Sequence, residues 1–147
     1  MNRDGTIGPQ FQTLDWSSNW TTARFYTVGG ATFLFLLKEG LGSVHIHRMN
    51  ENGTVGPRIQ SSSWTTGWSS AEFYKLGDAT FLFLLKAFAG TVHVHRMNEN
   101  GTVGPRIQDA AWSSNWTTAR LYNIGDAQFL FMLKVSDGRV DIHQVIT

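Results

Sequence analysis

Histidine recurs in this chain at a spacing that suits metal binding. Two pairs follow the pattern His-x-His and a third has Asp in first place: His45/His47, His93/His95 and Asp141/His143. Residues two apart on a strand share a face, and imidazoles on one face can ligate a metal ion. Such a pair without further ligands is a weak metal signal. We therefore interpret these residues as structural, hydrogen-bonding between neighbouring sheets, and expect no metal.

Tryptophan provides the stronger functional candidates, in three pairs: Trp16/Trp20, Trp64/Trp68 and Trp112/Trp116. An exposed indole offers a sugar ring an apolar face, and its N–H can donate a hydrogen bond. Polar residues lie within or shortly after the pairs, and we include them as candidate ligand-binding residues: Asn19, Arg24, Glu72, Asn115 and Arg120. This combination is typical of a carbohydrate pocket. The alternative is that one or both tryptophans of a pair form a core wedge, since Trp is usually largely buried.

These residues belong to a threefold internal repeat. Its period is 48 residues, the separation of Trp16, Trp64 and Trp112, and the segment VHIHRMNENGTVGPRIQ at 44–60 returns at 92–108 with one substitution. A period of this length indicates a repeat architecture. We expect one repeat domain over residues 1–147, with units at approximately 1–48, 49–96 and 97–147. The second unit has Gly and Glu where the others have Asn and Arg, so its pocket should differ.

Each unit is predicted to contain four short strands, which in the first unit are 21–29, 31–38, 43–49 and 53–60. Alternating apolar residues and an Asn-Gly turn favour strands joined by hairpins. Helical periodicity is absent, and Gly, Pro, Thr and Trp interrupt every candidate helix. The sequence therefore predicts an all-β protein.

The run FLFLLK at 33–38 is apolar on both faces, which indicates a strand between two layers. Inner strands of a β-propeller blade have that position, with a neighbouring blade on either side. A β-trefoil also has three four-stranded units, but its strands mostly bury one face, and a β-prism has the same symmetry. We predict three tandem four-stranded propeller blades, with the trefoil monomer and the prism as alternatives.

The strand order resembles that of WD-repeat blades, and Trp-rich units of this length resemble lectin propellers of the tectonin and tachylectin type. The resemblance covers the whole chain and rests on strand layout and on Trp and Gly placement. Together with the repeated Trp clusters, it implies a multivalent carbohydrate-binding module with a shallow pocket for each blade or blade junction. Repeated sites are a natural source of avidity.

Three blades do not close a ring. Four strands about 4.8 Å apart and about 20 Å long give each blade face roughly 400 Å². A chain of three blades leaves two bare faces. If both meet the bare faces of a second chain, about 1,600 Å² is buried, which is enough for a stable interface. We therefore expect a homodimer that forms a six-bladed ring. The outermost strand at 4–12 and the third strand at 138–147 are expected to be halves of one blade, completed between partners.

The composition excludes several other functions. The net charge is +1 with dispersed basic residues, which argues against nucleic acid or an anionic membrane as partner. The chain has no cysteine, and its start is too polar for a signal peptide. We expect a soluble protein, and the sequence does not indicate its location in the cell. No nucleophile–base set or nucleotide fingerprint is present, so we expect neither an enzyme nor a cofactor.

One functional alternative is a self-assembling propeller scaffold, natural or engineered, with no ligand of its own. The near-identity of residues 44–60 and 92–108 is as typical of design as of recent duplication. A metal-dependent hydrolase that uses the His-x-His pairs is a weaker third hypothesis.

Overall fold

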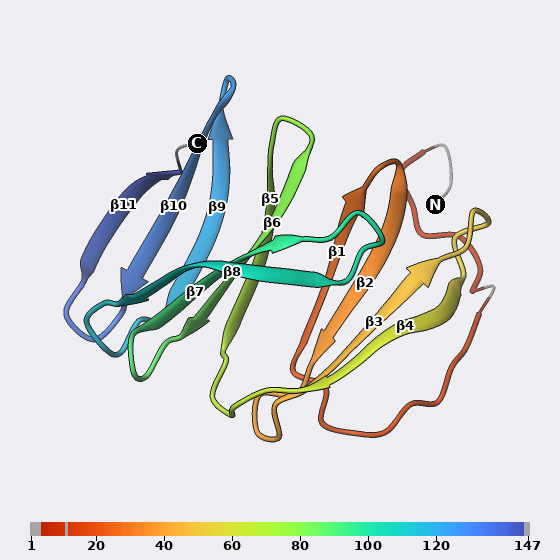
Figure 1. Cartoon of the computed structure of the whole chain (residues 1–147), viewed down its shortest axis with the longest axis horizontal. Coiled ribbons are helices and arrows are strands. Elements are labelled where there is room, and N and C mark those ends of the chain that lie inside the picture. Colours follow the sequence, from red (N-terminus) through yellow and green to blue (C-terminus); the bar gives the residue numbers. More distant parts are fainter. Residues whose placement is uncertain (1–3, 11, 146–147) are drawn as a thin grey trace.

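The computed structural model describes residues 4–10 and 12–145, which form three antiparallel sheets with no helix among them (Figure 1). The first sheet contains β1 (Thr22–Val28), β2 (Ala31–Leu37), β3 (Ser43–Met49) and β4 (Val55–Ser63) in that order. The second contains β5 (Ser70–Leu76), β6 (Ala79–Lys86), β7 (Thr91–Met97) and β8 (Val103–Ala111). The third contains β9 (Thr118–Ile124), β10 (Ala127–Lys134) and β11 (Arg139–Val145). The all-β prediction is confirmed.

Turn residues explain why each sheet is a simple meander. Asn52 accepts hydrogen bonds from the backbone N–H and the hydroxyl of Thr54, at 3.0 and 2.6 Å, and so shapes the turn before β4. Gly53 follows with a φ of 91°, which glycine adopts without steric cost. Asn100 and Gly101 repeat this turn before β8. The predicted Asn-Gly hairpins are thus present in the first two sheets.

Two hydrophobic cores lie between neighbouring sheets, and the middle sheet contributes to both. Leu82 and Leu84 of β6 belong to the core shared with the first sheet. Phe83 and Leu85 of the same strand belong to the core shared with the third sheet. Successive residues of a strand point to opposite faces, so burial on both faces removes the usual alternation. The interpretation of FLFLLK as a strand between two layers is confirmed for this sheet.

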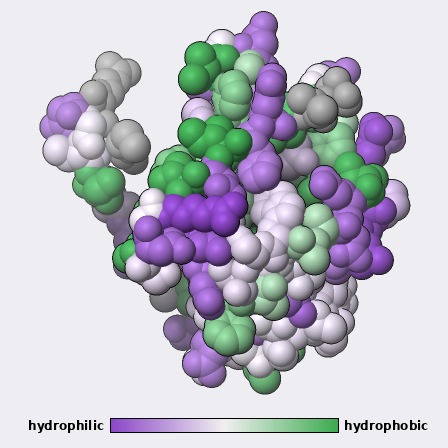
Figure 2. All heavy atoms as spheres, turned by 90° about the vertical axis from the view of Figure 1, so that its left-hand side faces the viewer, coloured by the Kyte–Doolittle hydropathy of each residue, from purple (hydrophilic) through white to green (hydrophobic). Residues whose placement is uncertain are grey.

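The third sheet ends without an outer strand and with an uncovered face. Val140 and Ile142 of β11 are 48% and 57% exposed, whereas the equivalent Val44 and Ile46 of β3 are fully buried. Among the described residues β11 pairs with β10 alone. Figure 2 views the molecule from this side, and hydrophobic side chains reach the surface there among polar ones.

The strand expected at 4–12 is not formed in the single chain, at residues 4–10 and 12. The free edge of β11, which would have to pair with it, lies at the opposite end of the row of sheets (Figure 1). The first strands of the three sheets, β1, β5 and β9, lie next to one another and line a common hollow of about 520 Å³. Within the described ranges, nothing forms a helix of the length and apolarity that crossing a membrane requires.

Candidate functional site

The tryptophan pairs and the His-x-His pairs come together, although they are about 30 residues apart in each unit. In the first unit the ring of Trp16 stacks on that of His47, with centroids 5.3 Å apart and an interplanar angle of 19°. Trp20 packs at a tilt on His45, at 4.8 Å. The two histidines share the face of β3 that points away from Val44 and Ile46, as residues two apart on a strand must. The connection before β1 therefore lies across this face.

The other units repeat the arrangement. Trp64 lies parallel to His95 at 6.2 Å, and Trp68 packs at a tilt on His93 at 4.7 Å. In the third unit the rings of Trp112 and His143 are parallel to within 1°, at 4.6 Å. Asp141 takes the place of the first histidine there. One constellation is thus built three times from the same two motifs.

A lysine completes each constellation, and our sequence analysis did not identify it. The Nζ atom of Lys38 lies 4.7 Å from the ring centroid of Trp20 and donates to the Ser17 hydroxyl at 2.9 Å. Such a placement is a cation–π contact. Equivalent contacts join Lys86 to Trp68 at 4.9 Å and Lys134 to Trp116 at 4.7 Å. The 48-residue spacing of these lysines was the available signal.

Two of the three constellations line separate clefts. The first cleft has a volume of about 390 Å³ and is lined by Trp16, Ser17, Trp20, His45, His47 and Arg58. The second has about 320 Å³ and is lined by Ser63, Trp64, Thr65, Trp68, Leu84, His93 and His95. In the third unit Trp112 and His143 instead line a larger cavity of about 580 Å³ between the second and third sheets.

The two tryptophans of a pair differ in burial, which decides between the two interpretations of them. Trp68 and Trp116 are only 3% and 4% exposed and belong to the cores between sheets. Trp64 and Trp112 are half-buried, and Trp16 is 42% exposed. The second tryptophan is thus a wedge between sheets at both junctions, while the first presents part of its ring to solvent.

Asn19 lies in the segment before β1 and Asn115 in the connection between the second and third sheets, and neither lines one of the two clefts. Both adopt a left-handed backbone, with φ of 73° and 66°. Gly67 occupies the same position of the second unit with a φ of 95°. Asn and Gly are the residues that tolerate this conformation best, so the turn accounts for their alternation.

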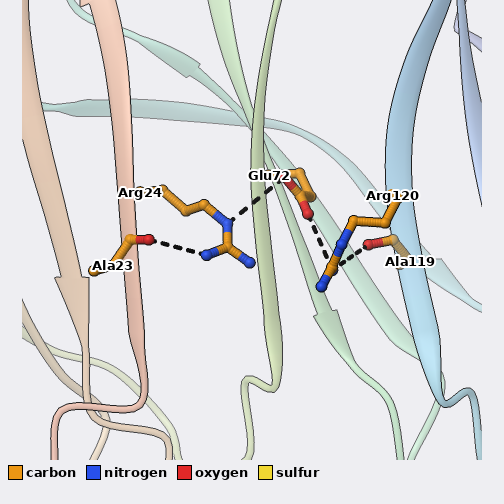
Figure 3. A network of polar contacts seen from close by, with 5 residues as sticks. All are labelled: Ala23, Arg24, Glu72, Ala119 and Arg120. Carbon is orange, nitrogen blue, oxygen red and sulfur yellow. Dashed lines mark hydrogen bonds and ion pairs between the residues drawn. The ribbon is translucent and has the colours of Figure 1, made fainter. Parts of the chain in front are cut away.

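Arg24, Glu72 and Arg120 form a separate polar network on the first strands of the three sheets (Figure 3). The Nε atom of Arg24 lies 3.7 Å from Glu72, and Nη1 of Arg120 donates to Glu72 at 3.3 Å. Burial raises the pKa of Glu72, and the two guanidinium groups oppose this effect. None of the three side chains lines a Trp–His cleft.

The histidines make their hydrogen bonds within a sheet, whereas we expected bonds between sheets. The Nδ1 atom of His47 lies 3.1 Å from the Gly56 carbonyl, and that of His95 lies 3.1 Å from the Gly104 carbonyl. These glycines belong to the outer strands β4 and β8, next to the register shifts after Ile46 and Val94.

Burial lowers the pKa of His45, and the nearby charge of Arg58 lowers it further. The pKa of His93 is lowered by burial and then by Arg106, while Asp109 opposes the change. Neutral imidazoles are therefore favoured in these two clefts. Within residues 4–10 and 12–145, no group of three or more His, Asp or Glu side chains is placed to hold a metal ion.

No protein-family model matches the sequence, and no curated protein matches it. The site is therefore interpreted from its own geometry.

Proposed function

We propose that the chain is a multivalent carbohydrate-binding module in which a sugar ring stacks on the first tryptophan of each unit. The observation that carries the proposal is the recurrence of one Trp–His arrangement three times at equivalent positions. Repeated identical sites suit binding more than catalysis, because each adds avidity on a surface with repeated ligands.

The chemistry of the clefts supports a hydroxyl-rich ligand. The exposed part of Trp16 offers an apolar face, and its other face is supported by His47. His45 and Arg58 line the same cleft. A neutral imidazole has one donor and one acceptor, and a guanidinium has donors only. A stacked ring with several hydroxyl groups could use all of these.

The test is a titration with neutral and acidic sugars, read by quenching of Trp fluorescence and checked on a glycan array. Replacing Trp16, Trp64 or Trp112 by Ala should weaken binding at the altered cleft by roughly tenfold, because one stacking contact is removed. The matched control is Phe88→Ala, which removes an 85% exposed aromatic side chain that lines neither the two Trp–His clefts nor the cavity at Trp112. Absence of binding to any sugar at millimolar concentration would contradict the proposal.

A scaffold without a ligand is the second candidate, and the burial of Trp68 and Trp116 favours it. In that case the tryptophans serve only to hold neighbouring sheets together. Trp116→Ala should then unfold the protein, while Trp16→Ala should have no binding to lose. A loss of sugar binding in correctly folded Trp16→Ala distinguishes the first candidate from the second.

We further propose that the three sheets are propeller blades that close as a six-bladed ring in a homodimer. Three observations support blades: the meander order of each sheet, the cores between successive sheets, and the common hollow lined by β1, β5 and β9. The open face of the third sheet supports closure by a second copy. In such a ring the two Trp–His clefts of each chain, four in all, would be available to one multivalent ligand.

A further inference from the structure

The cavity of about 580 Å³ between the second and third sheets has a filled counterpart at the preceding junction. Its lining includes Tyr74 and Phe81 from the second sheet and Val145 from the third. The residues 48 positions earlier, Tyr26 and Phe33 among them, belong instead to a closed core that Val103 packs against. The difference is that Val103 begins an outer strand, whereas within residues 4–10 and 12–145 the third sheet has none.

A recurring hydrogen bond shows how the outer strands follow one another. The Gln12 side-chain oxygen accepts from the backbone N–H of Val55 at 3.0 Å. The Gln60 side-chain oxygen accepts from the N–H of Val103 at 2.9 Å, one repeat further on. Gln108 is the next residue of the series and lines the cavity. The next donor of the series would stand 48 residues after Val103, which is the repeat position of Ile7.

We propose that residues 4–10 and 12–15 of a second copy add to the free edge of β11 as the missing fourth strand. This inference rests on the ring closure proposed above and specifies how the two copies join. Ile7 of the second copy takes the place that Val103 has in the first junction, and its N–H donates to Gln108. The exchange is reciprocal, so both third sheets are completed.

The segment already has the turn that precedes an outer strand in the first two sheets. Asp4 accepts hydrogen bonds from the backbone N–H and the hydroxyl of Thr6 at 3.0 and 2.6 Å, as Asn52 does from Thr54. Ile7 is 84% exposed in the single chain, whereas its counterpart Val103 is partly buried. The segment therefore has an apolar side chain to bury and no need to refold its turn.

The register of the first sheet, carried forward by the repeat, gives complementary neighbours. Ser43 lies opposite Ser63 and Val44 opposite Ser62 in β3 and β4. The equivalent pairs between copies are Arg139 with Asp15, and Val140 with Leu14. Cross-strand neighbours of opposite charge attract. Arg139 pairs with Asp141 of its own strand at 3.1 Å, and Asp15 of the second copy would add a second carboxylate partner, where the first sheet has two serines.

A tyrosine contact extends the match beyond the strand. The Tyr26 hydroxyl donates to the Gly101 carbonyl, which joins the first sheet to the turn before β8. The corresponding pair is Tyr74 with Gly5 of the second copy. Tyr74 lines the cavity, so its hydroxyl would reach the added turn in the same way.

The test uses a cysteine pair in a chain that has no cysteine of its own. Leu14 and Val140 are both 48% exposed in the single chain, so Leu14→Cys and Val140→Cys should not disturb folding. Directly opposed residues of antiparallel strands lie within disulfide range. The double variant should form a covalent dimer under mild oxidation, read on a non-reducing gel. The matched control combines Leu14→Cys with Val135→Cys, an exposed site in the turn after β10 that would not face Leu14.

If the wild type is a dimer in solution but the double cysteine variant forms no covalent dimer, strand addition is overturned. Ring closure is then left in place. A disulfide within one chain also overturns it, because the segment would then fold back on its own sheet. A single-chain mass at all concentrations overturns both proposals. As a second variant, Asp15→Arg should weaken the dimer roughly tenfold, because it places a second cation opposite Arg139; an unchanged dimer would contradict this pairing.

Discussion

At the scale of residues, the two tryptophans of a pair share a motif but have different environments. Trp68 is enclosed by side chains from two sheets, while Trp64 keeps part of its ring open against His95. The division arises because the second tryptophan of a pair reaches the core between sheets and the first remains at its rim. The buried partner fixes the connection, and the open one leaves part of its ring exposed to solvent.

The histidines beneath the tryptophans should make stability sensitive to acid. The folded-state pKa of His45 and of His93 is below the ordinary value of 6.5. The unfolded chain therefore binds these protons more readily, and the stabilisation present above pH 6.5 is lost as pH falls through the folded-state values. Between about pH 7 and pH 5, the unfolding free energy of the wild type should fall more than that of the His45→Gln/His93→Gln variant. Urea unfolding at a series of pH values measures this.

Glu72 should affect the pH dependence of stability in the opposite direction. Its pKa is raised, so the folded state binds the proton more readily and gains stability as pH falls through that value. Glu72→Gln lacks this gain, and its stability should fall more steeply than that of the wild type on acidification. The pH dependence of the unfolding free energy should change in opposite directions in Glu72→Gln and in the His45→Gln/His93→Gln variant. A change in the same direction would contradict the pKa shifts of Glu72 and the two histidines.

At the scale of elements, sheets are joined by close contact between a turn of one sheet and an aromatic ring of the next. Gly101, in the turn before β8, packs on the Phe33 ring of β2, and Tyr26 donates to its carbonyl. A Cβ atom at this glycine would collide with the aromatic carbons. The turn can approach the first sheet only because its residue has no side chain.

Gly101→Ala should therefore lower the free energy of unfolding by about 2–4 kcal/mol, from steric overlap and a strained backbone together. The matched control is Gly77→Ala, which has a φ of 61° and open space around the added atom. Strain alone should cost that variant about 1–2 kcal/mol. Chemical denaturation measures both, and equal losses would show that the contact with Phe33 is unimportant.

Strand positions could be predicted from the sequence because burial pattern and turn chemistry are local. The strand predicted at 43–49 forms as Ser43–Met49, and the run 33–38 indicated two covered faces. The partners of side chains could not be predicted in the same way. Trp20 and Arg24 are close in the chain, yet Trp20 packs on β3 and Arg24 pairs with β5. The outermost strand begins and ends later than expected, at Val55 and Ser63, because the residues after Gln60 continue the pairing with β3 as far as Ser43.

At the scale of the whole molecule, the two ends of the row of sheets are not alike. The N-terminal end has its face covered by the chain's own Trp16–Trp20 connection, which packs on His45 and His47. The C-terminal end has bare apolar residues on β11. Unlike surfaces fit head to tail, and a head-to-tail contact closes when the rotation between units completes a circle.

Light scattering should therefore give a mass near twice 16.4 kDa at micromolar concentration. Dilution should lower the mass toward that of one chain, because the interface is the only connection between copies. A mass of 16.4 kDa at every concentration would show that the open face of the third sheet is stable in water and that no ring closes. A larger mass would indicate a ring of more than two chains.

The hydrogen bond between Gln and Val that recurs every 48 residues has a consequence for how such a gene can change length. Every repeat begins and ends in the middle of a sheet. Duplication of one repeat therefore adds a complete set of contacts between sheets and leaves the existing contacts between sheets in place. Genes can then grow or shrink by whole repeats, and fusing two copies in tandem would give a single polypeptide whose closure no longer depends on protein concentration.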